Sequence, residues 1–345
     1  MVAPSVRDAT ASSKKTNSAL LELLQPITPE LARVEEELAE QVTGFDKRVQ
    51  HYVDYVLRGS GKRLRPTLAL LAGGASGRIY DGHITLGVIV ELIHIATLVH
   101  DDILDEAQLR HGLETANSRW GNEVSVLLGD CLFAHALKLA ASYPTTEVCR
   151  RVSEATNTVC AGEILQTERR FDVNLVQHQY IDIINMKTGA LFAVSCELGA
   201  SLNGSPPTVV ESLREFGTNL GIAYQIYDDC VDILGQERKA GKSLGTDVKK
   251  GKLTLPYLLL LQDARPEERR ALGDMIFRDE AQDREQLSAL VARNDVVNKS
   301  LITIDSYIAR AEQSLTVLGA NQYRQTLAGL LQYLSQQSRQ LLQTA

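Results

Sequence analysis

Apolar residues recur at intervals of three and four along most of this chain, the spacing of an amphipathic α-helix. The segment 31–42, LARVEEELAEQV, follows Thr28-Pro29-Glu30, which combine an N-cap, a proline at the first helical position and an early acid. We therefore expect the ordered chain to begin at Thr28. Residues 1–27 begin with polar sequence that lacks the apolar centre of a secretory signal, and we interpret them as a mobile tail.

The most apolar stretch, residues 84–99, carries Glu91 and His94 and is shorter than the roughly 20 residues that cross a bilayer, so it predicts a buried helix. Further helical segments follow, separated only by short turns such as Tyr143-Pro144 and 203–207. No linker divides them. Residues 28–345 are therefore predicted to form one all-α domain, a single large helical bundle.

Composition agrees with helices, because 5% aromatic residues is low for a β-sandwich or barrel. The net charge of −7 disfavours a nucleic-acid binder, which needs a broad basic face. The cysteines are scattered, odd in number and without the paired spacing of a zinc site, which predicts reduced core thiols and a cytoplasmic protein. They are Cys131, Cys149, Cys160, Cys196 and Cys230.

Two acidic motifs of the form D-D-x-x-D carry the candidate chemistry, at 101–105 (DDILD) and at 228–232 (DDCVD). On a helix, Asp101 and Asp105 lie one turn apart on one face and repel each other, so a cation is expected between them. Mg²⁺ suits hard oxygen ligands and is commonly shared between carboxylates and substrate phosphates. One such motif alone is as readily a solvated acidic face. Its repetition, and the apolar lead-in to the first copy, favour metal sites at the mouth of a buried cavity.

Basic residues occur in three groups that suit phosphate binding. They are GKRLRP at 61–66, MKTG at 186–189, and the lysines Lys242, Lys249, Lys250 and Lys252 in a glycine-punctuated stretch after the second acidic motif. In isolation, the first group is more often a solvated loop and the second equally often a surface lysine beside a helix kink. His94 precedes Asp101 by nearly two turns, and a buried core histidine is its alternative interpretation.

Taken together, six stretches resemble the trans-isoprenyl diphosphate (polyprenyl) synthase family, in order, from about Gly59 to Pro256. They are GKRLRP, ELIHIATLVHDDILD, WGNEVSVLLGD, MKTGALF, GIAYQIYDDCVDILG and GKSLGTDVKKGKLTLP. The resemblance implies an isoprenoid synthase bundle with a central cavity. It also implies Mg²⁺-dependent, head-to-tail trans condensation of isopentenyl diphosphate with an allylic diphosphate to a polyprenyl diphosphate.

The resemblance also implies roles for particular residues. About three Mg²⁺ would be bound by Asp101, Asp102, Asp105, Asp228, Asp229 and Asp232. Isopentenyl diphosphate would be held by Lys62, Arg65 and His94. The allylic diphosphate would be surrounded by Arg110, Lys187, Thr188, Gln225, Lys242 and Lys252. Of these, we take Asp101, Asp105, Asp228, Lys187 and Lys242 as the catalytic set.

The chain departs from the family pattern after the first acidic motif. The family usually has Arg-Arg-Gly there, and this chain has Arg110-His111-Gly112. A diphosphate-binding cation is thus replaced by a titratable imidazole, so His111 is the expected fourth contact to isopentenyl diphosphate. We expect this change to affect isopentenyl diphosphate binding.

The depth of the cavity below Asp101 is expected to set product length, because a helical turn of about 5.4 Å nearly matches one isoprene unit. Ala96 and Thr97 are small, and Ile93 lies one turn further, so no aromatic floor is expected. A long-chain product is therefore predicted. The alternative is a short-chain farnesyl or geranylgeranyl diphosphate synthase whose floor is Leu132 or Phe133 on a facing helix.

Three other classes of protein fit the sequence less well. A terpene cyclase would carry a different second metal motif, and a squalene or phytoene synthase would show wider acidic spacing. A non-catalytic subunit of a heteromeric synthase would typically lack one complete acidic motif, and both are complete here. We expect a homodimer without a transmembrane segment or nucleic-acid partner, and peripheral membrane contact for product release.

Overall fold

The computed structural model describes residues 19–59, 61–110, 112–234, 246–262, 264–278 and 280–342, and almost all of them are helical. The first elements are η1 (Gln25–Ile27), α2 (Thr28–Glu40), η2 (Gln41–Gly44), α3 (Gln50–Leu57), α4 (Leu64–Ser76), α5 (Asp81–Leu104), β1 (Leu109–Arg110), β2 (Leu113–Glu114), α6 (Ala116–Ala140) and α7 (Glu147–Glu168). Then follow α8 (Gln177–Ile184), η3 (Asn185–Gly189), α9 (Ala190–Ser201), α10 (Pro207–Leu234), α12 (Thr246–Lys249), α13 (Leu255–Gln262), α14 (Pro266–Arg278), α15 (Ala281–Arg293), α16 (Val296–Ser314), η4 (Leu315–Val317) and α17 (Gln322–Leu342).

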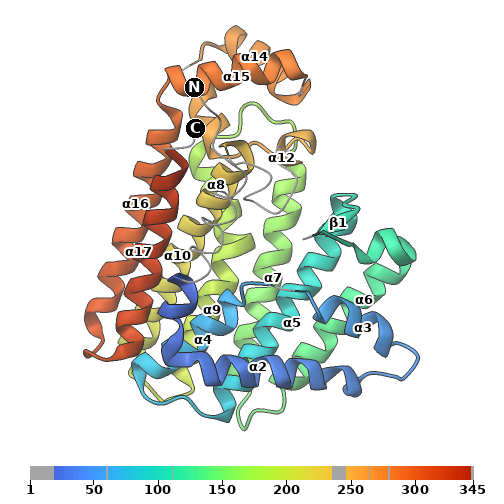
Figure 1. Ribbon diagram of the computed structural model, residues 1–345, viewed down its shortest axis with the longest axis vertical. Coiled ribbons are helices and arrows are strands. Elements are labelled where there is room, and N and C mark those ends of the chain that lie inside the picture. Colours follow the sequence, from blue (N-terminus) through green and yellow to red (C-terminus); the bar gives the residue numbers. More distant parts are fainter. Residues whose placement is uncertain are drawn as a thin grey trace.

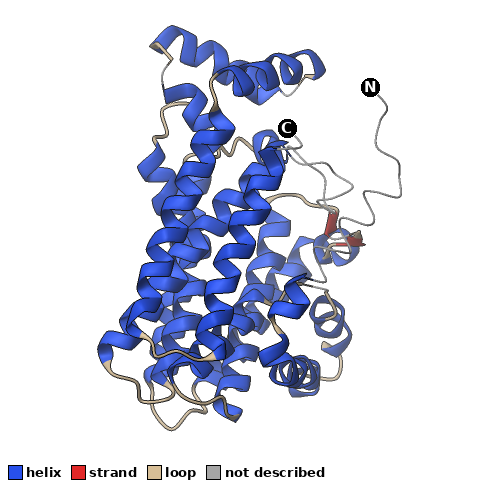
Figure 2. Ribbon diagram, turned by 60° about the vertical axis from the view of Figure 1, so that its left-hand side comes forward, coloured by secondary structure: helices blue, strands red, loops and turns tan. Residues whose placement is uncertain are grey.

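The helices form one bundle around a core built mainly from α4, α5, α9 and α10. Figure 1 shows α5, α7 and α10 running along the long axis, with α16 and α17 on one flank. Helix α2 crosses one end of the bundle, and α14 with α15 crosses the other, as the turned view in Figure 2 also shows. The closest packing is between α5 and α6, α9 and α10, α10 and α16, and α4 and α9. The predicted all-α bundle is confirmed.

Two glycines let the core helices approach closely. A Cβ at Gly199 of α9 would lie 2.5 Å from the carbonyl oxygen of Ala69 in α4. A Cβ at Gly217 of α10 would lie 2.5 Å from the carbonyl oxygen of Phe192 in α9. Only glycine permits these crossings, which fix α10, and with it the second acidic motif, against α9.

Among the described residues, α5 is the one helix that is long and apolar enough to cross a membrane. It has 24 residues, and 72% of its most apolar stretch is buried inside the protein. Ile84, Leu92 and Ile93 are fully buried. The prediction of a buried core helix is confirmed, although the helix is longer than its apolar stretch indicated.

Two details differ from the sequence-based expectations. Helical structure is already present at residues 19–23, and Leu24 and Ile27 are buried, so the described structure begins before Thr28. A two-stranded antiparallel hairpin, β1 and β2, interrupts the helices after α5, pairing Leu109 with Glu114. Short polar connections favour such a turn more than a helix.

The cysteine prediction was only partly right. None of the five cysteines forms a disulfide, and Cys196 and Cys230 are buried. Cys131 of α6 and Cys160 of α7 are exposed, however, and Cys149 is half-buried. The expectation of core thiols was wrong for the exposed pair, because helical context alone does not tell which face is covered.

Candidate active site

The first acidic motif lies at the C-terminal end of α5. Asp101 is half-buried, and burial together with the nearby Glu163 and Asp105 raises its pKa to about 6, although Lys187 and Lys252 act in the other direction. Asp102 is buried and accepts bonds of 2.8–3.1 Å from the guanidinium of Arg110 in β1. Asp102 is therefore already paired with Arg110, a residue predicted to bind diphosphate. The negative charge of Asp101 is only partly balanced by nearby cations.

Asp105 follows the last residue of α5 and meets the turn that comes after α12. Lys252 donates to both of its oxygens at 2.9 and 3.1 Å, and Lys250 Nζ is 3.4 Å from Oδ2. These two lysines hold the pKa of Asp105 below its ordinary value, even though burial acts to raise it. Asp105, a predicted metal ligand, is thus in direct contact with Lys252, a predicted diphosphate-binding residue.

The second acidic motif lies in the last turns of α10, where Asp229 and Asp232 are buried and Asp228 is half-buried. Asp229, 5% exposed, accepts hydrogen bonds from Tyr180 of α8 at 2.5 Å and from the amide of Gln225 at 2.8 Å. Burial and the neighbouring Asp247 raise its pKa to about 8. Gln225 in turn accepts from the Thr188 hydroxyl at 2.7 Å. The structure therefore joins three of the predicted residues in one hydrogen-bonded chain.

The segment 246–252 links the two acidic motifs. The backbone N–H of Asp247 lies 3.4 Å from Oδ2 of Asp232, which is 2% exposed, while Lys252 reaches Asp105. Lys252 N–H also donates to the carbonyl of Asp247 at 2.9 Å. Asp105 and Asp232, which are 127 positions apart in the sequence, therefore both bond to one short segment. Figure 1 shows α12 at the end of the bundle toward which α5, α7 and α10 run.

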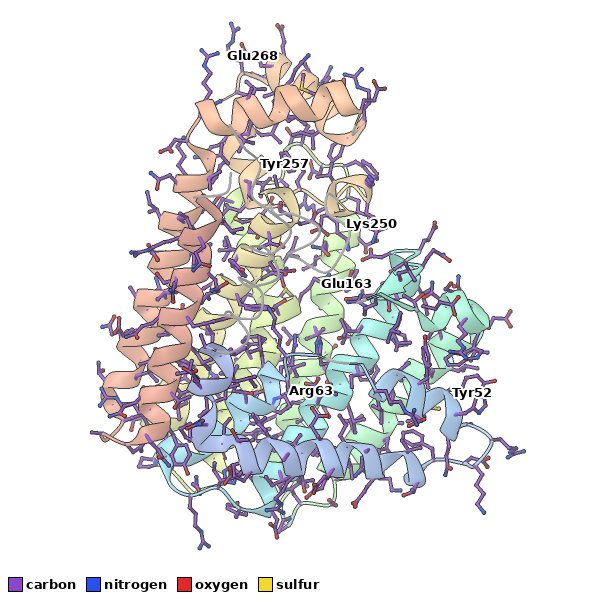
Figure 3. All side chains as sticks on the ribbon, viewed as in Figure 1. Tyr52, Arg63, Glu163, Lys250, Tyr257 and Glu268 are labelled. Atoms are coloured by element: carbon purple, nitrogen blue, oxygen red, sulfur yellow. The ribbon has the colours of Figure 1, made fainter. Side chains whose placement is uncertain are left out.

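Lys187 lies in a π-helical turn, η3, between α8 and α9. Single π turns often occur at functional sites, because they redirect side chains from a helix. The Lys187 ammonium donates to Gln166 at 2.6 Å and forms an ion pair with Glu163, both on α7. Its charge also acts on Asp101. Figure 3 labels Glu163 near the middle of the molecule, with Lys250 above it.

The predicted isopentenyl diphosphate residues gather beside the core helices α9 and α10. Lys62 is exposed, with Nζ 5.9 Å from the ring centroid of Tyr224, and the Arg65 guanidinium lies 5.2 Å from the ring of Phe192. Arg65 Nε is buried without a hydrogen-bond partner in the described chain. Burial, with Arg65 and Arg110 nearby, holds the pKa of His94 well below its ordinary value, so this imidazole is neutral.

Arg63 does not join that group, although the sequence placed it among three candidate phosphate cations. It has a left-handed backbone (φ 49°) and turns its guanidinium to Glu91 of α5 at 2.7 Å and Glu35 of α2 at 2.6 Å. Glu91 is only 2% exposed. Arg63, labelled in Figure 3, therefore fixes the loop that carries Lys62 and the first turn of α4, which carries Arg65.

The carboxyl groups fit divalent ions that are shared with substrate. Among the described residues, no group of three or more His, Cys, Asp or Glu is placed to hold a metal alone. Magnesium commonly takes one or two carboxylates together with phosphate oxygens and water. Asp101 and Asp229, whose pKa values are raised by burial, are carboxyls whose ionised form a cation would stabilise.

The residues expected to set product length lie where the sequence placed them, along α5 below Asp101. Ala96 and Ile93 are fully buried, and Thr97 is half-buried. Of the two alternative floor residues on α6, Leu132 is fully buried and Phe133 lies 5.7 Å, ring to ring, from His100. Product length remains a prediction.

Two predicted site residues, His111 and Lys242, lie outside the described residues. Four residues near the motifs were missed by the sequence reasoning. They are Glu163, Gln166, Arg170 and Tyr180. The stretch 162–166, GEILQ, carries two of them, and its acidic and amide side chains at helical spacing were the available signal. Tyr180 and Arg170 stand in no recognisable pattern.

Known proteins resemble this chain over most of its length. A family model described as polyprenyl synthetase matches residues 46–293. The octaprenyl diphosphate synthase of Escherichia coli (strain K12) is 34% identical over 72% of this chain and 77% of its own. The all-trans-nonaprenyl-diphosphate synthase (geranyl-diphosphate specific) of Rhodobacter capsulatus is 33% identical over 90% of this chain and 95% of its own.

A solved structure agrees. The polyprenyl synthase of Caulobacter crescentus CB15, complexed with calcium and isoprenyl diphosphate, has a TM-score of 0.85 at 31% identity, covering 92% of this chain and 97% of that one. The predicted fold and the prenyltransferase class are thereby confirmed. With two complete acidic motifs that both bond to the segment 246–252, this chain belongs to the polyprenyl synthetase family.

Proposed function

We propose that this protein condenses isopentenyl diphosphate with an allylic diphosphate, head to tail and in the trans configuration, to make a long-chain polyprenyl diphosphate. The observation that carries this proposal is the meeting of both acidic motifs at the 246–252 turn, with Lys252 bonded to Asp105 and Asp247 to Asp232. The carboxylates that would bind metal and the cations that would bind diphosphate then lie together around this segment.

The metal would be held by the six aspartates of the two motifs, as about three Mg²⁺ shared with the allylic diphosphate. Bound Mg²⁺ would neutralise the departing diphosphate. Calcium in the Caulobacter structure supports a divalent ion beside a prenyl diphosphate. Lys252 and Arg110, which bond Asp105 and Asp102, would donate to diphosphate oxygens once the carboxylates bind metal.

The chain's own residues would direct the rest of the reaction. Lys187, beside Asp101, would stabilise charge on the leaving diphosphate. Lys62, Arg65 and neutral His94 would hold isopentenyl diphosphate so that its double bond faces the allylic carbon. The buried apolar faces of α5 and α9 would keep water from the allylic cation. The released diphosphate is a suitable acceptor for the proton that is then lost.

A long product is supported by the side chains below Asp101. Ala96 is the fully buried residue five positions before Asp101, and Ile93 is buried a turn below it. Neither is aromatic, and the octaprenyl and nonaprenyl synthases described above are long-chain enzymes by name. A short-chain product, with Leu132 or Phe133 as the floor, is the alternative.

A homodimer is supported by exposed apolar residues on two adjacent helices. Leu127 and Cys131 stand one turn apart on α6, and Cys160 and Ile164 stand one turn apart on α7. Exposed apolar faces of this kind usually mark contacts between proteins. We also propose a cytoplasmic location with peripheral membrane contact, since a long polyprenyl product is insoluble in water.

Product analysis tests this function. The purified chain is incubated with Mg²⁺, radiolabelled isopentenyl diphosphate and farnesyl diphosphate, and the dephosphorylated products are separated by reversed-phase chromatography. A ladder ending well beyond 20 carbons supports the proposal. A product that stops at geranylgeranyl would establish the short-chain alternative, and a folded chain that extends no primer would favour the non-catalytic subunit.

A further inference from the structure

Arg170 is a cation beside the first acidic motif that the roles assigned above do not use. It lies in the turn after α7, and its Nη2 is 3.6 Å from Oδ1 of Asp105. That separation is too long for a hydrogen bond. Its Nε and Nη2 are both buried, and neither has a hydrogen-bond partner in the described chain. Buried donors of this kind are nearly always satisfied in functional proteins, so they point to a ligand.

The turn that carries Arg170 is held firmly in place by its neighbour. Phe171 has a left-handed backbone (φ 62°), and its N–H donates to the carbonyl of Gly251 at 2.8 Å. Its ring covers Gly251, where a Cβ would lie only 2.6 Å away, and meets Phe277 of α14 with centroids 5.1 Å apart. A bulky residue keeps such a conformation only when its surroundings impose it.

Charge pairing with Asp105 does not account for Arg170. Lys252 already donates to both oxygens of Asp105, and Lys250 lies 3.4 Å from one of them. Three cations therefore surround a single carboxylate, and the third makes no hydrogen bond to it. Around Asp105 the cations outnumber the carboxylate, which suits a further anion beside it. The adjacent Nε and Nη2 of an arginine form a two-donor edge that matches two phosphate oxygens.

We propose that Arg170 is a further diphosphate-binding residue, whose Nε–Nη2 edge donates to the diphosphate bound at the first acidic motif. This proposal rests on the proposed function. The ligand chemistry is a magnesium-bound diphosphate, which the allylic substrate and the released pyrophosphate share. Arg170 and Lys252 then reach the same group from two turns that the Phe171–Gly251 hydrogen bond joins.

Binding of inorganic pyrophosphate to the full-length chain tests the proposal without turnover. Titration calorimetry at saturating Mg²⁺ compares wild type with Arg170→Gln, Arg170→Lys and Arg169→Gln. The last variant is the matched control, because Arg169 lies in the same turn but forms an exposed pair with Asp172 at 3.0 Å. We expect Arg170→Gln to weaken binding about tenfold or more, Arg170→Lys to recover only part of it, and Arg169→Gln to match wild type.

Two further measurements tell whether Arg170 binds the allylic substrate as well as the released pyrophosphate, and whether it acts directly or through Asp105. The Michaelis constant for the allylic diphosphate rises in Arg170→Gln if the substrate is bound as well as the product, while that for isopentenyl diphosphate stays near wild type. Unchanged pyrophosphate binding by a folded Arg170→Gln variant overturns the proposal. So does a loss that appears only at subsaturating Mg²⁺ and vanishes at saturation, because Arg170 would then act only through metal binding at Asp105.

The proposed function fails separately, and its failure is recognisable. If the wild-type chain neither extends a primer nor binds pyrophosphate with Mg²⁺, the function is wrong and Arg170 has no diphosphate to bind. If the wild type does both and Arg170→Gln equals it, only the role of Arg170 is wrong.

Discussion

At the residue scale, the carboxyl groups of the acidic motifs hold protons more tightly than an ordinary aspartate. The pKa of Asp101 is about 6 and that of Asp229 about 8, in both cases chiefly because burial disfavours the charge. Without metal, the ionised motifs therefore weaken the fold that positions them. Function and stability are opposed at these residues.

We predict that Asp101→Asn stabilises the metal-free protein and abolishes its activity. The folded chain holds the Asp101 proton up to a pH of about 6 and the unfolded chain only to about 3.8, so stability contributed by this group falls as pH rises between them. Asparagine removes that loss, which amounts to up to about 3 kcal/mol. Thermal unfolding in EDTA should show a higher midpoint for the variant at pH 7.5 and none of that gain at pH 4.

Turnover gives the second half of this prediction. Loss of one metal carboxylate should cost several kcal/mol of transition-state stabilisation, which is about a thousandfold or more in rate. A variant that is destabilised at pH 7.5, or that keeps most of its activity, would show that Asp101 is a structural carboxylate.

We further predict that Mg²⁺ raises the unfolding midpoint more at pH 8 than at pH 5.5. Protons compete with the metal for Asp101 and Asp229, whose pKa values lie within or near this range. Calorimetry with and without Mg²⁺ measures the difference at each pH. An equal or smaller rise at pH 8 would argue against metal binding by these two residues.

Spacing alone predicted the six aspartates, because a repeated short motif is visible in one dimension. It could not predict Tyr180 or Glu163, which reach Asp229 and Lys187 only after α8 and α7 fold against α10 and η3. It also grouped Arg63 with Lys62 and Arg65 as three cations of a possible phosphate-binding stretch. Arg63 instead forms an ion pair with the buried Glu91, which lies 28 residues further along the chain, and the sequence offers no sign of this contact.

At the element scale, the loop before α4 is anchored to α5 through Arg63 and Glu91. Through Glu91, near its middle, helix α5 helps to position Lys62 and Arg65. It carries Asp101 near its C-terminal end. Hydrophobic pattern predicted the buried helix α5 well, since a long apolar stretch dominates it. The hairpin β1–β2 and the π-helical turn η3 were not predicted, because both depend on packing between elements and not on local pattern.

Glu91→Gln should damage isopentenyl diphosphate binding by releasing this loop. We expect a loss of about 3–5 kcal/mol in stability, because a buried charge loses its partner, and a higher Michaelis constant for isopentenyl diphosphate with a smaller change in kcat. Glu35→Gln is the matched control, since its half-exposed pair with the same Arg63 should be worth under about 1 kcal/mol. Equal effects of the two changes would rule out a special role for the buried pair.

At the scale of the whole molecule, the bundle presents an apolar face on α6 and α7 that no other part of the described structure covers. Leu127 and Ile164 are 63% and 61% exposed. We predict that Leu127→Glu dissociates the homodimer, as measured by sedimentation. Ile302→Glu on α16, where the native side chain is 65% exposed, should leave the dimer intact. A monomeric wild type, or dissociation by both variants, would contradict this assignment of the interface.

The most direct test of the account is metal-dependent prenyl transfer by the purified chain alone. Radiolabelled isopentenyl diphosphate and an allylic diphosphate are supplied with Mg²⁺ or with EDTA, and label in the extended prenyl product is counted over time for wild type, Asp101→Asn and Asp228→Asn. We predict steady incorporation by wild type with Mg²⁺, and almost none with EDTA or with either variant, since both motifs act on one substrate. Incorporation that survives EDTA or the loss of one motif would contradict the central claim.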